Sequence, residues 1–109
     1  MEWLVPWHSV ADDPALVADL AQELARELSA GHTLHGLQVR TLACRQDCDD
    51  VLFAIEDGTE RVAVVHLTWT HSPPDPPPWP GSVVYPSFEV WVAEGMRADH
   101  DEFHSESPG

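Results

Sequence analysis

Lysine is absent from this chain, so its five arginines carry all of the positive side-chain charge at neutral pH. The chain also has 19 acidic residues, which gives a formal net charge of −14. Nucleic-acid binding depends largely on Lys and Arg that neutralise phosphates, and anionic membranes attract the same residues. The composition therefore predicts no binding to nucleic acids or membranes. It is typical of a solvated acidic surface, and it also suits a basic protein partner.

Long hydrophobic runs are absent as well. No apolar stretch approaches the ~20 residues that a transmembrane helix needs. The N-terminus carries Glu2 where a secretory signal would be basic. A hydrophobic content of 43% in 109 residues suffices for a packed core. We therefore expect a single globular domain over residues 1–109, in the cytoplasm.

Cysteine is scarce: Cys44 and Cys48 are too few for a disulfide framework. Their spacing is compatible with zinc ligands, but structural zinc sites usually have four. His100 and His104 share a helix face as in the H-E-x-x-H motif, but Glu102 occupies the third position instead of the second. We expect no metal site and no cofactor, and these two cysteines and two histidines are only weak candidate ligands.

The centre of the chain has the pattern of a β-hairpin. Val51–Glu56 and Arg61–Trp69 are apolar and β-branched, and Asp57-Gly58 between them is a strong turn signal. Both faces of the hairpin are apolar, so both need cover. Phe53 is predicted to lie in the core.

The register of the hairpin depends on the length of its loop. With an even number of loop residues, Phe53 shares a face with Val62, and Glu56 lies opposite Arg61 as a cross-strand ion pair. An odd number would break this pairing, because a shift of one residue reverses the faces of a strand. The sequence leaves both loop lengths open, and both faces of the hairpin are apolar in either case.

Two helices flank the strands. The first is predicted to start with Asp13 as N-cap and Pro14 as first helical residue, and to run to about Ser29. The second is predicted to start at Ser87 and to run to about Phe103. Each has one apolar stripe: Leu16, Val17, Leu20, Leu24 and Leu28 in the first helix, and Phe88, Trp91, Val92 and Met96 in the second.

The remaining segments are shorter. Leu37–Arg45 is predicted to be a strand and Val83–Tyr85 a short edge strand. Residues 1–11 are aromatic and interrupted by proline, as in an edge strand or a flap. Residues 72–81 contain six of the ten prolines and form a loop of polyproline character. Residues 104–109 are a frayed tail.

These elements predict a two-layer α+β sandwich of order α-β-β-β-α, with an antiparallel sheet and two helices packed mainly on one face. The second face then needs the 1–11 segment and the Pro-rich loop with Trp79 as cover, because large open apolar patches usually mark interfaces. With that cover the protein is a monomer. Without it, the face would form a dimer or partner surface.

Catalytic signatures are weak. Asp47–Leu52 has the form of the D-x-D-x-V signature of haloacid-dehalogenase phosphotransferases, but it does not follow a buried strand and the required lysine is missing. No G-x-S-x-G nucleophile signature occurs. An enzyme would have to use His66, His100, His104 and the Asp47–Asp50 turn. We expect a protein that is not an enzyme.

The order of elements resembles double-stranded-RNA-binding domains, but Ser87-Phe88-Glu89 replaces the basic helix start of those domains. Asp47–Phe53, Val64–Trp69 and Tyr85–Glu89 are similar to segments of a family of small bacterial proteins with no established activity, a likeness that spans residues 12–103. It implies a bacterial cytoplasmic origin. The leading hypothesis is a non-enzymatic binding or accessory module, immunity- or inhibitor-like towards a basic protein.

Overall fold

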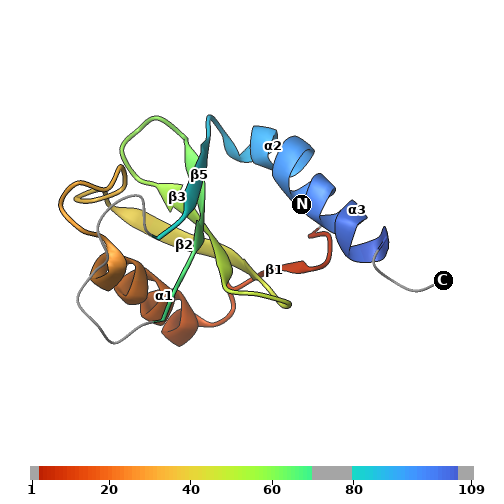
Figure 1. The fold of residues 1–109 in the computed structure, drawn as a ribbon, viewed down its shortest axis with the longest axis horizontal. Helices are drawn as coiled ribbons and strands as arrows, with labels where there is room; N and C mark the ends of the chain where they lie inside the picture. Colours follow the sequence, from red (N-terminus) through yellow and green to blue (C-terminus); the bar gives the residue numbers. More distant parts are fainter. Residues whose placement is uncertain (1–2, 70–79, 106–109) are drawn as a thin grey trace.

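The computed structural model describes residues 3–69 and 80–105, which form an antiparallel sheet flanked by helices (Figure 1). The five strands lie in the order β1-β2-β3-β4-β5. The α+β class and the antiparallel sheet are therefore confirmed. None of the helices in the described ranges has the length and apolar character needed to cross a membrane. The elements are β1 (Trp7–Ser9), α1 (Pro14–Glu27), β2 (Val39–Arg45), β3 (Asp50–Ile55), β4 (Val62–His66), β5 (Ser82–Tyr85), α2 (Phe88–Trp91), the π-helical turn η1 (Val92–Met96) and α3 (Arg97–Ser105).

Helix α1 begins where its capping residues predict. The Asp13 side chain accepts a hydrogen bond from the backbone N–H of Leu16 at 3.1 Å, and Pro14 occupies the first turn. The helix ends at Glu27, two residues before the predicted end at Ser29. Its apolar stripe packs on the sheet.

The hairpin of β3 and β4 is confirmed, and its loop has an odd number of residues, so the register of the even loop does not form. Phe53 lies opposite Ala63, and the N–H of Ile55 donates to the carbonyl of Arg61 at 3.0 Å. The loop thus holds the five residues 56–60, an odd number. Glu60 adopts a positive φ of 63° that lengthens the turn, and neither Asp57 nor Gly58 signals this in the sequence.

With the odd loop, the residues of the two strands share faces in other combinations than the even loop would give. Phe53 shares its face with Val51 and Val65, and Leu52 shares the other face with Val62 and Val64. Glu56 does not pair with Arg61, but lies 3.6 Å from Arg40 on β2. Phe53 is nevertheless fully buried, as predicted.

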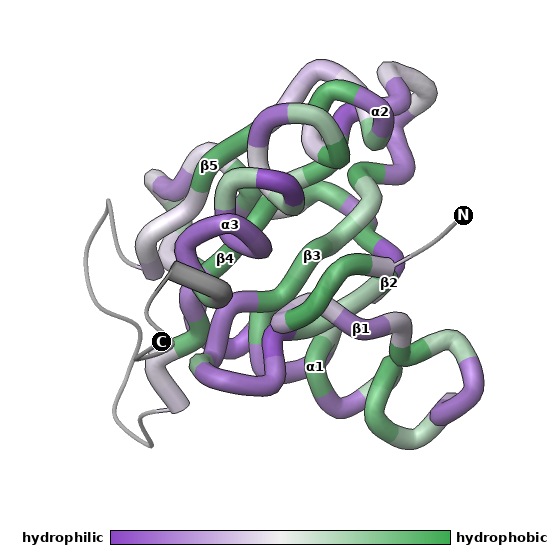
Figure 2. The backbone as a smooth tube through the Cα atoms, turned by 90° about the vertical axis from the view of Figure 1, so that its right-hand side faces the viewer, coloured by the Kyte–Doolittle hydropathy of each residue, from purple (hydrophilic) through white to green (hydrophobic). Residues whose placement is uncertain are grey.

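The two helical segments cover opposite faces of the sheet (Figures 1 and 2). The prediction that both pack mainly on one face is wrong, because Trp91 and Met96 pack on Leu52 and not on the face that carries Phe53. The buried cluster beneath α1 contains Leu20, Leu24, Leu34, Val51, Phe53, Ile55, Ala63, Val65 and Leu67. The cluster on the other face contains Trp7, Ala43, Leu52, Val62, Trp91 and Met96.

The N-terminal segment completes the second face. Strand β1 pairs with β2 at the edge of the sheet, and Trp3 and Leu4 pack against the second cluster. The edge strand is thus present, and this segment covers the second face together with the C-terminal helix, which the prediction places on the other face. Residues 72–79 of the Pro-rich loop, including Trp79, lie outside the described residues. Pro80 is buried, and its carbonyl accepts a hydrogen bond from His32 Nε2 at 2.9 Å.

The C-terminal helix, comprising α2, η1 and α3, starts at the predicted cap. The Ser87 hydroxyl accepts a hydrogen bond from the N–H of Val90 at 3.2 Å. A Cβ atom on Gly95 would lie 2.6 Å from the indole of Trp91. Gly95 therefore lets the ring pack against the helix backbone within the π-helical turn.

Candidate functional site

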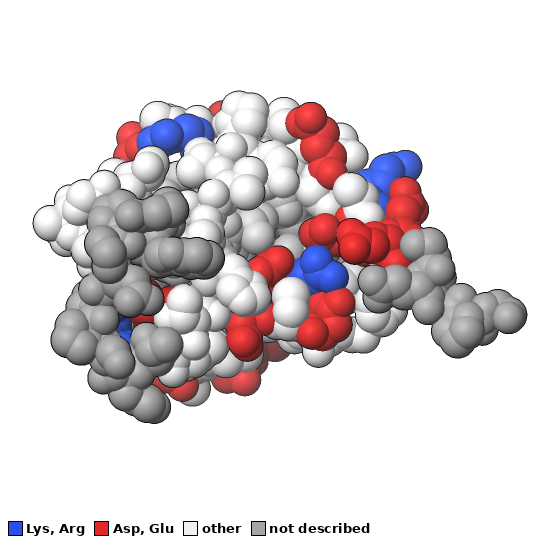
Figure 3. Space-filling model, in the orientation of Figure 1, with Lys and Arg blue, Asp and Glu red and all other residues white. Residues whose placement is uncertain are grey.

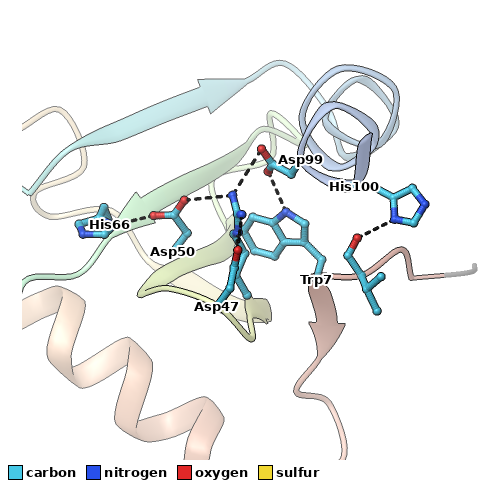
Figure 4. A network of polar contacts seen from close by, with 8 residues as sticks. Trp7, Asp47, Asp50, His66, Asp99 and His100 are labelled. Atoms are coloured by element: carbon cyan, nitrogen blue, oxygen red, sulfur yellow. Dashed lines mark hydrogen bonds and ion pairs between the residues drawn. The ribbon is translucent and has the colours of Figure 1, made fainter. Parts of the chain in front are cut away.

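A polar network surrounds Arg45, the last residue of β2 (Figure 4). Its Nε and Nη2 atoms donate to the two carboxylate oxygens of Asp47 at 2.8 and 2.7 Å. Its Nη1 lies 3.5 Å from Asp99 and 4.0 Å from Asp50. Only 15% of the Arg45 side chain is exposed, so one guanidinium is held among three carboxylates.

Separate parts of the chain supply this network. Asp47 lies in the turn between β2 and β3, Asp50 starts β3, and Asp99 belongs to α3. Trp7 lies opposite Arg45 in the β1–β2 ladder and donates from Nε1 to Asp99 at 2.8 Å. The contacts therefore join the N-terminal strand, the sheet and the C-terminal helix at one place.

The charges of the network reinforce one another. Hydrogen bonding to Asp47, with the nearby Asp99, raises the pKa of Arg45 further above its ordinary value. The same guanidinium lowers the pKa of Asp47. One guanidinium cannot neutralise three carboxylates, so the cluster keeps a net negative charge at neutral pH.

His66 and Asp50, both singled out from the sequence, are brought together. The Nδ1 atom of His66 lies 2.7 Å from an oxygen of Asp50, whose other oxygen faces Arg45. The imidazole is 55% exposed at the end of β4. A carboxylate that orients a histidine occurs in hydrolytic triads, where a nucleophile completes the set. Here the carboxylate instead links the histidine to the Arg45 network.

The weak metal candidates are dispersed. Cys44 packs against the cluster beneath α1 and lies 3.4 Å from His8 Nε2, while Cys48 is exposed in the β2–β3 turn. Both thiols are free, and burial raises the pKa of Cys44. His100 donates from Nδ1 to the carbonyl of Val5 at 2.6 Å.

His104 lies in α3, but its side chain is outside the described part of the structure. Among the side chains that are described, no group of three or more His, Cys, Asp or Glu is placed to hold a metal ion.

Acidic side chains gather around the Arg45 network (Figure 3). They lie over α3 and over the turn between β2 and β3. Asp99 and Glu94, which belongs to η1, are both near enough to Tyr85 to raise its pKa, after its burial. We call this surface the acidic face, made of Asp47, Asp49, Asp50, Glu94 and Asp99. Four of the five arginines lie within 4.0 Å of a carboxylate of this chain, so most of the positive charge is used internally.

Comparison with protein-family models, curated proteins and solved structures finds no match to this chain. The resemblance to a bacterial family stays a prediction, and function has to be inferred from the geometry.

Sequence reasoning singled out the Asp47–Asp50 turn and His66 but missed Arg45, Trp7 and Asp99. One signal was available: an arginine in a chain with so few cations, two residues before an aspartate, is a natural centre for acidic residues. Its contact with Asp99, 54 residues further along, depends on tertiary structure.

Proposed function

We propose that this chain is a non-enzymatic, cytoplasmic binding module of bacterial origin that accepts a basic protein on its acidic face. The observation that carries the proposal is the Arg45 network, which fixes Asp47 in the β2–β3 turn, Asp50 at the start of β3 and Asp99 on α3. Preorganised groups lose little conformational entropy when a partner binds. Each carboxylate can also accept more hydrogen bonds than the network uses.

Charge supports a basic protein as the partner. A net charge of −14 steers cationic surfaces towards the chain and repels nucleic acids. Complementary charge raises association rates more than it raises affinity, which suits an immunity- or inhibitor-like protein that must capture a basic toxin or nuclease quickly. A gene for such a toxin next to the gene for this chain would support this version, and a metabolic operon would favour the enzyme alternative.

The test compares two variants of equal net charge. Asp49→Asn with Glu94→Gln removes two charges from the acidic face, and Asp12→Asn with Asp19→Asn removes two charges near and on α1. All four side chains belong to exposed residues, so both variants should fold. The probe is a nona-arginine peptide, whose association rate is measured by stopped flow at ~0.05 and ~0.15 M salt, where screening differs.

The acidic-face variant should slow association several-fold more than the α1 variant does, and the difference should shrink as salt rises. Equal slowing in both variants would show that only net charge matters, and would contradict a localised binding face.

A further inference from the structure

A groove lies beside the aromatic side chains that pack under the C-terminal helix. The second face of the sheet forms its floor, and Val17, Thr41 and Ile55 of the α1 side also line it. Its volume is about 880 Å³, within the range of about 300–1,000 Å³ that is usual for small-molecule sites. Leu42, Ala54 and Val62 of the sheet line it, and Trp3 and Phe88 form an aromatic wall. These two rings contact each other edge to face, with centroids 5.9 Å apart.

The opening of the groove carries charges of both signs. Arg40 and Arg61 line it together with Glu56 and Glu60, so two of the five arginines of a lysine-free chain are placed here. Arg61 is engaged by Asp57, with Nη2 2.9 Å from the carboxylate. Arg40 is 64% exposed and lies 3.6 Å from Glu56, a looser contact that leaves its other donors accessible.

We propose that this groove binds a small amphipathic molecule with a flat apolar body and a single carboxylate. The body lies on the sheet floor and against the rings of Trp3 and Phe88, where edge-to-face contacts add to hydrophobic burial. The carboxylate pairs with the guanidinium of Arg40, whose planar fork suits two parallel hydrogen bonds.

The two glutamates at the opening of the groove restrict the class of ligand further. Glu56 and Glu60 repel a doubly charged group more than a singly charged one, which disfavours phosphate monoesters relative to a monocarboxylate. The groove is lined by residues other than the five of the acidic face, so this inference does not depend on the proposed protein partner.

Three probes of equal shape test the proposal: 2-naphthoate, 2-naphthylmethanol and 2-naphthylmethylamine, titrated by calorimetry and by tryptophan fluorescence. We expect naphthoate to bind about tenfold more tightly than the alcohol, because the charge-assisted pair adds to the same apolar contact. The amine should bind more weakly than naphthoate.

Variants locate the site. Arg40→Gln should weaken naphthoate binding by about tenfold and leave the alcohol unchanged. Arg97→Gln, which removes an exposed arginine that does not line the groove, is the charge-matched control and should change neither. Ala54→Phe should block both probes by filling the floor.

Three results would overturn the proposal. The first is no binding of naphthoate at concentrations up to about 5 mM. The second is tighter binding of the amine than of naphthoate, and the third is an equal effect of Arg40→Gln and Arg97→Gln on naphthoate binding. If Ala54→Phe fails to fold, the comparison of Arg40→Gln with Arg97→Gln still decides, because both replace exposed side chains.

Discussion

The two faces of the sheet are covered by different kinds of buried side chain. Beneath α1 the core is mainly aliphatic, with Phe53 at its centre. Beneath the C-terminal helix it is aromatic: Trp7 and Trp91 meet edge to face with ring centroids 5.1 Å apart, and Phe88 adjoins them. The aliphatic face is closed by one regular helix. The aromatic face is assembled from both ends of the chain, and it also carries the Arg45 network and the groove.

The two faces also differ in how far their charged side chains are exposed to solvent. On the α1 side, Glu27 is only 4% exposed and its carboxylate accepts hydrogen bonds from the N–H groups of Thr68 and Trp69 at 2.8 and 2.9 Å. That carboxylate fixes the chain just after β4. On the other side, the network of Arg45, Asp47 and Asp50 is reachable from solvent. Both of our proposals place binding on the aromatic side of the molecule, whereas the α1 face carries the aliphatic core.

The largest expected effect is on the aliphatic face. Phe53→Ala should lower the free energy of unfolding by about 3–5 kcal/mol, as is typical for truncating a fully buried aromatic residue. Urea denaturation followed by circular dichroism measures it. Val83→Ala, at a side chain that is 55% exposed, is the control and should change stability by no more than about 0.5 kcal/mol. A similar loss in both variants would mean that the core is misplaced.

A second variant examines the aromatic face through its helix. Helix propensity alone predicts that Gly95→Ala would stabilise by up to about 1 kcal/mol. The added Cβ would instead meet the Trp91 ring at 2.6 Å, and such overpacking typically destabilises by about 1–3 kcal/mol. Ala93→Gly is the control, at an exposed residue two positions before Gly95. Its free energy of unfolding should fall by about 1 kcal/mol through helix propensity alone. A more stable Gly95→Ala protein would show that the ring moves away easily.

Local signals in the sequence predicted the helix starts, because Asp13 and Ser87 act on donors within three residues. The hairpin was predicted for the same reason. Its register was not, since the positive φ of Glu60 is set by the closed loop and not by a residue type that favours it. The side taken by the C-terminal helix was also missed: apolar spacing shows that Trp91 and Met96 face a core, but not which of two apolar sheet faces they meet.

The next effect examines the polar network of the aromatic face. Asp99→Ala removes the acceptor of the Trp7 indole N–H, and Trp7 is only 1% exposed. An unsatisfied buried donor typically reduces stability by about 1–3 kcal/mol, and the partial exposure of Asp99 places this case near 1 kcal/mol. Thermal unfolding with tryptophan fluorescence as readout measures it. Asp101→Ala, on the exposed side of α3, should have no measurable effect; equal effects would show that the Trp7 bond contributes nothing.

The smallest effect concerns two carboxyl groups on α1, and it is read from its dependence on pH. Burial, and then hydrogen bonding with the Glu27 carboxylate, raises the pKa of Glu23 above the ordinary 4.5. Burial would raise the pKa of Glu27 too, but hydrogen bonds from Glu23, Thr68 and Trp69 lower it. Glu23 therefore holds a proton more tightly in the folded state than in the unfolded state, and Glu27 holds one less tightly.

The signs of the two contributions are opposite. A raised folded pKa stabilises fully below the unfolded value, and this stability is lost as pH rises through the folded value. Glu23→Gln keeps a neutral donor at all pH values, so its stability relative to the natural protein should increase from pH 4 to pH 7. We expect the increase to stay below about 1 kcal/mol, because the Glu23→Gln variant also lacks the ion pair between Glu23 and Arg26. Urea unfolding at each pH measures it.

Glu27→Gln is the matched control. The lowered pKa of Glu27 stabilises the natural protein at pH values above the ordinary pKa. This variant should therefore be least stable relative to the natural protein at pH 7 and should recover as pH falls. Parallel pH profiles for the two variants would show that the carboxyl groups titrate independently and that the proton is not shared between them.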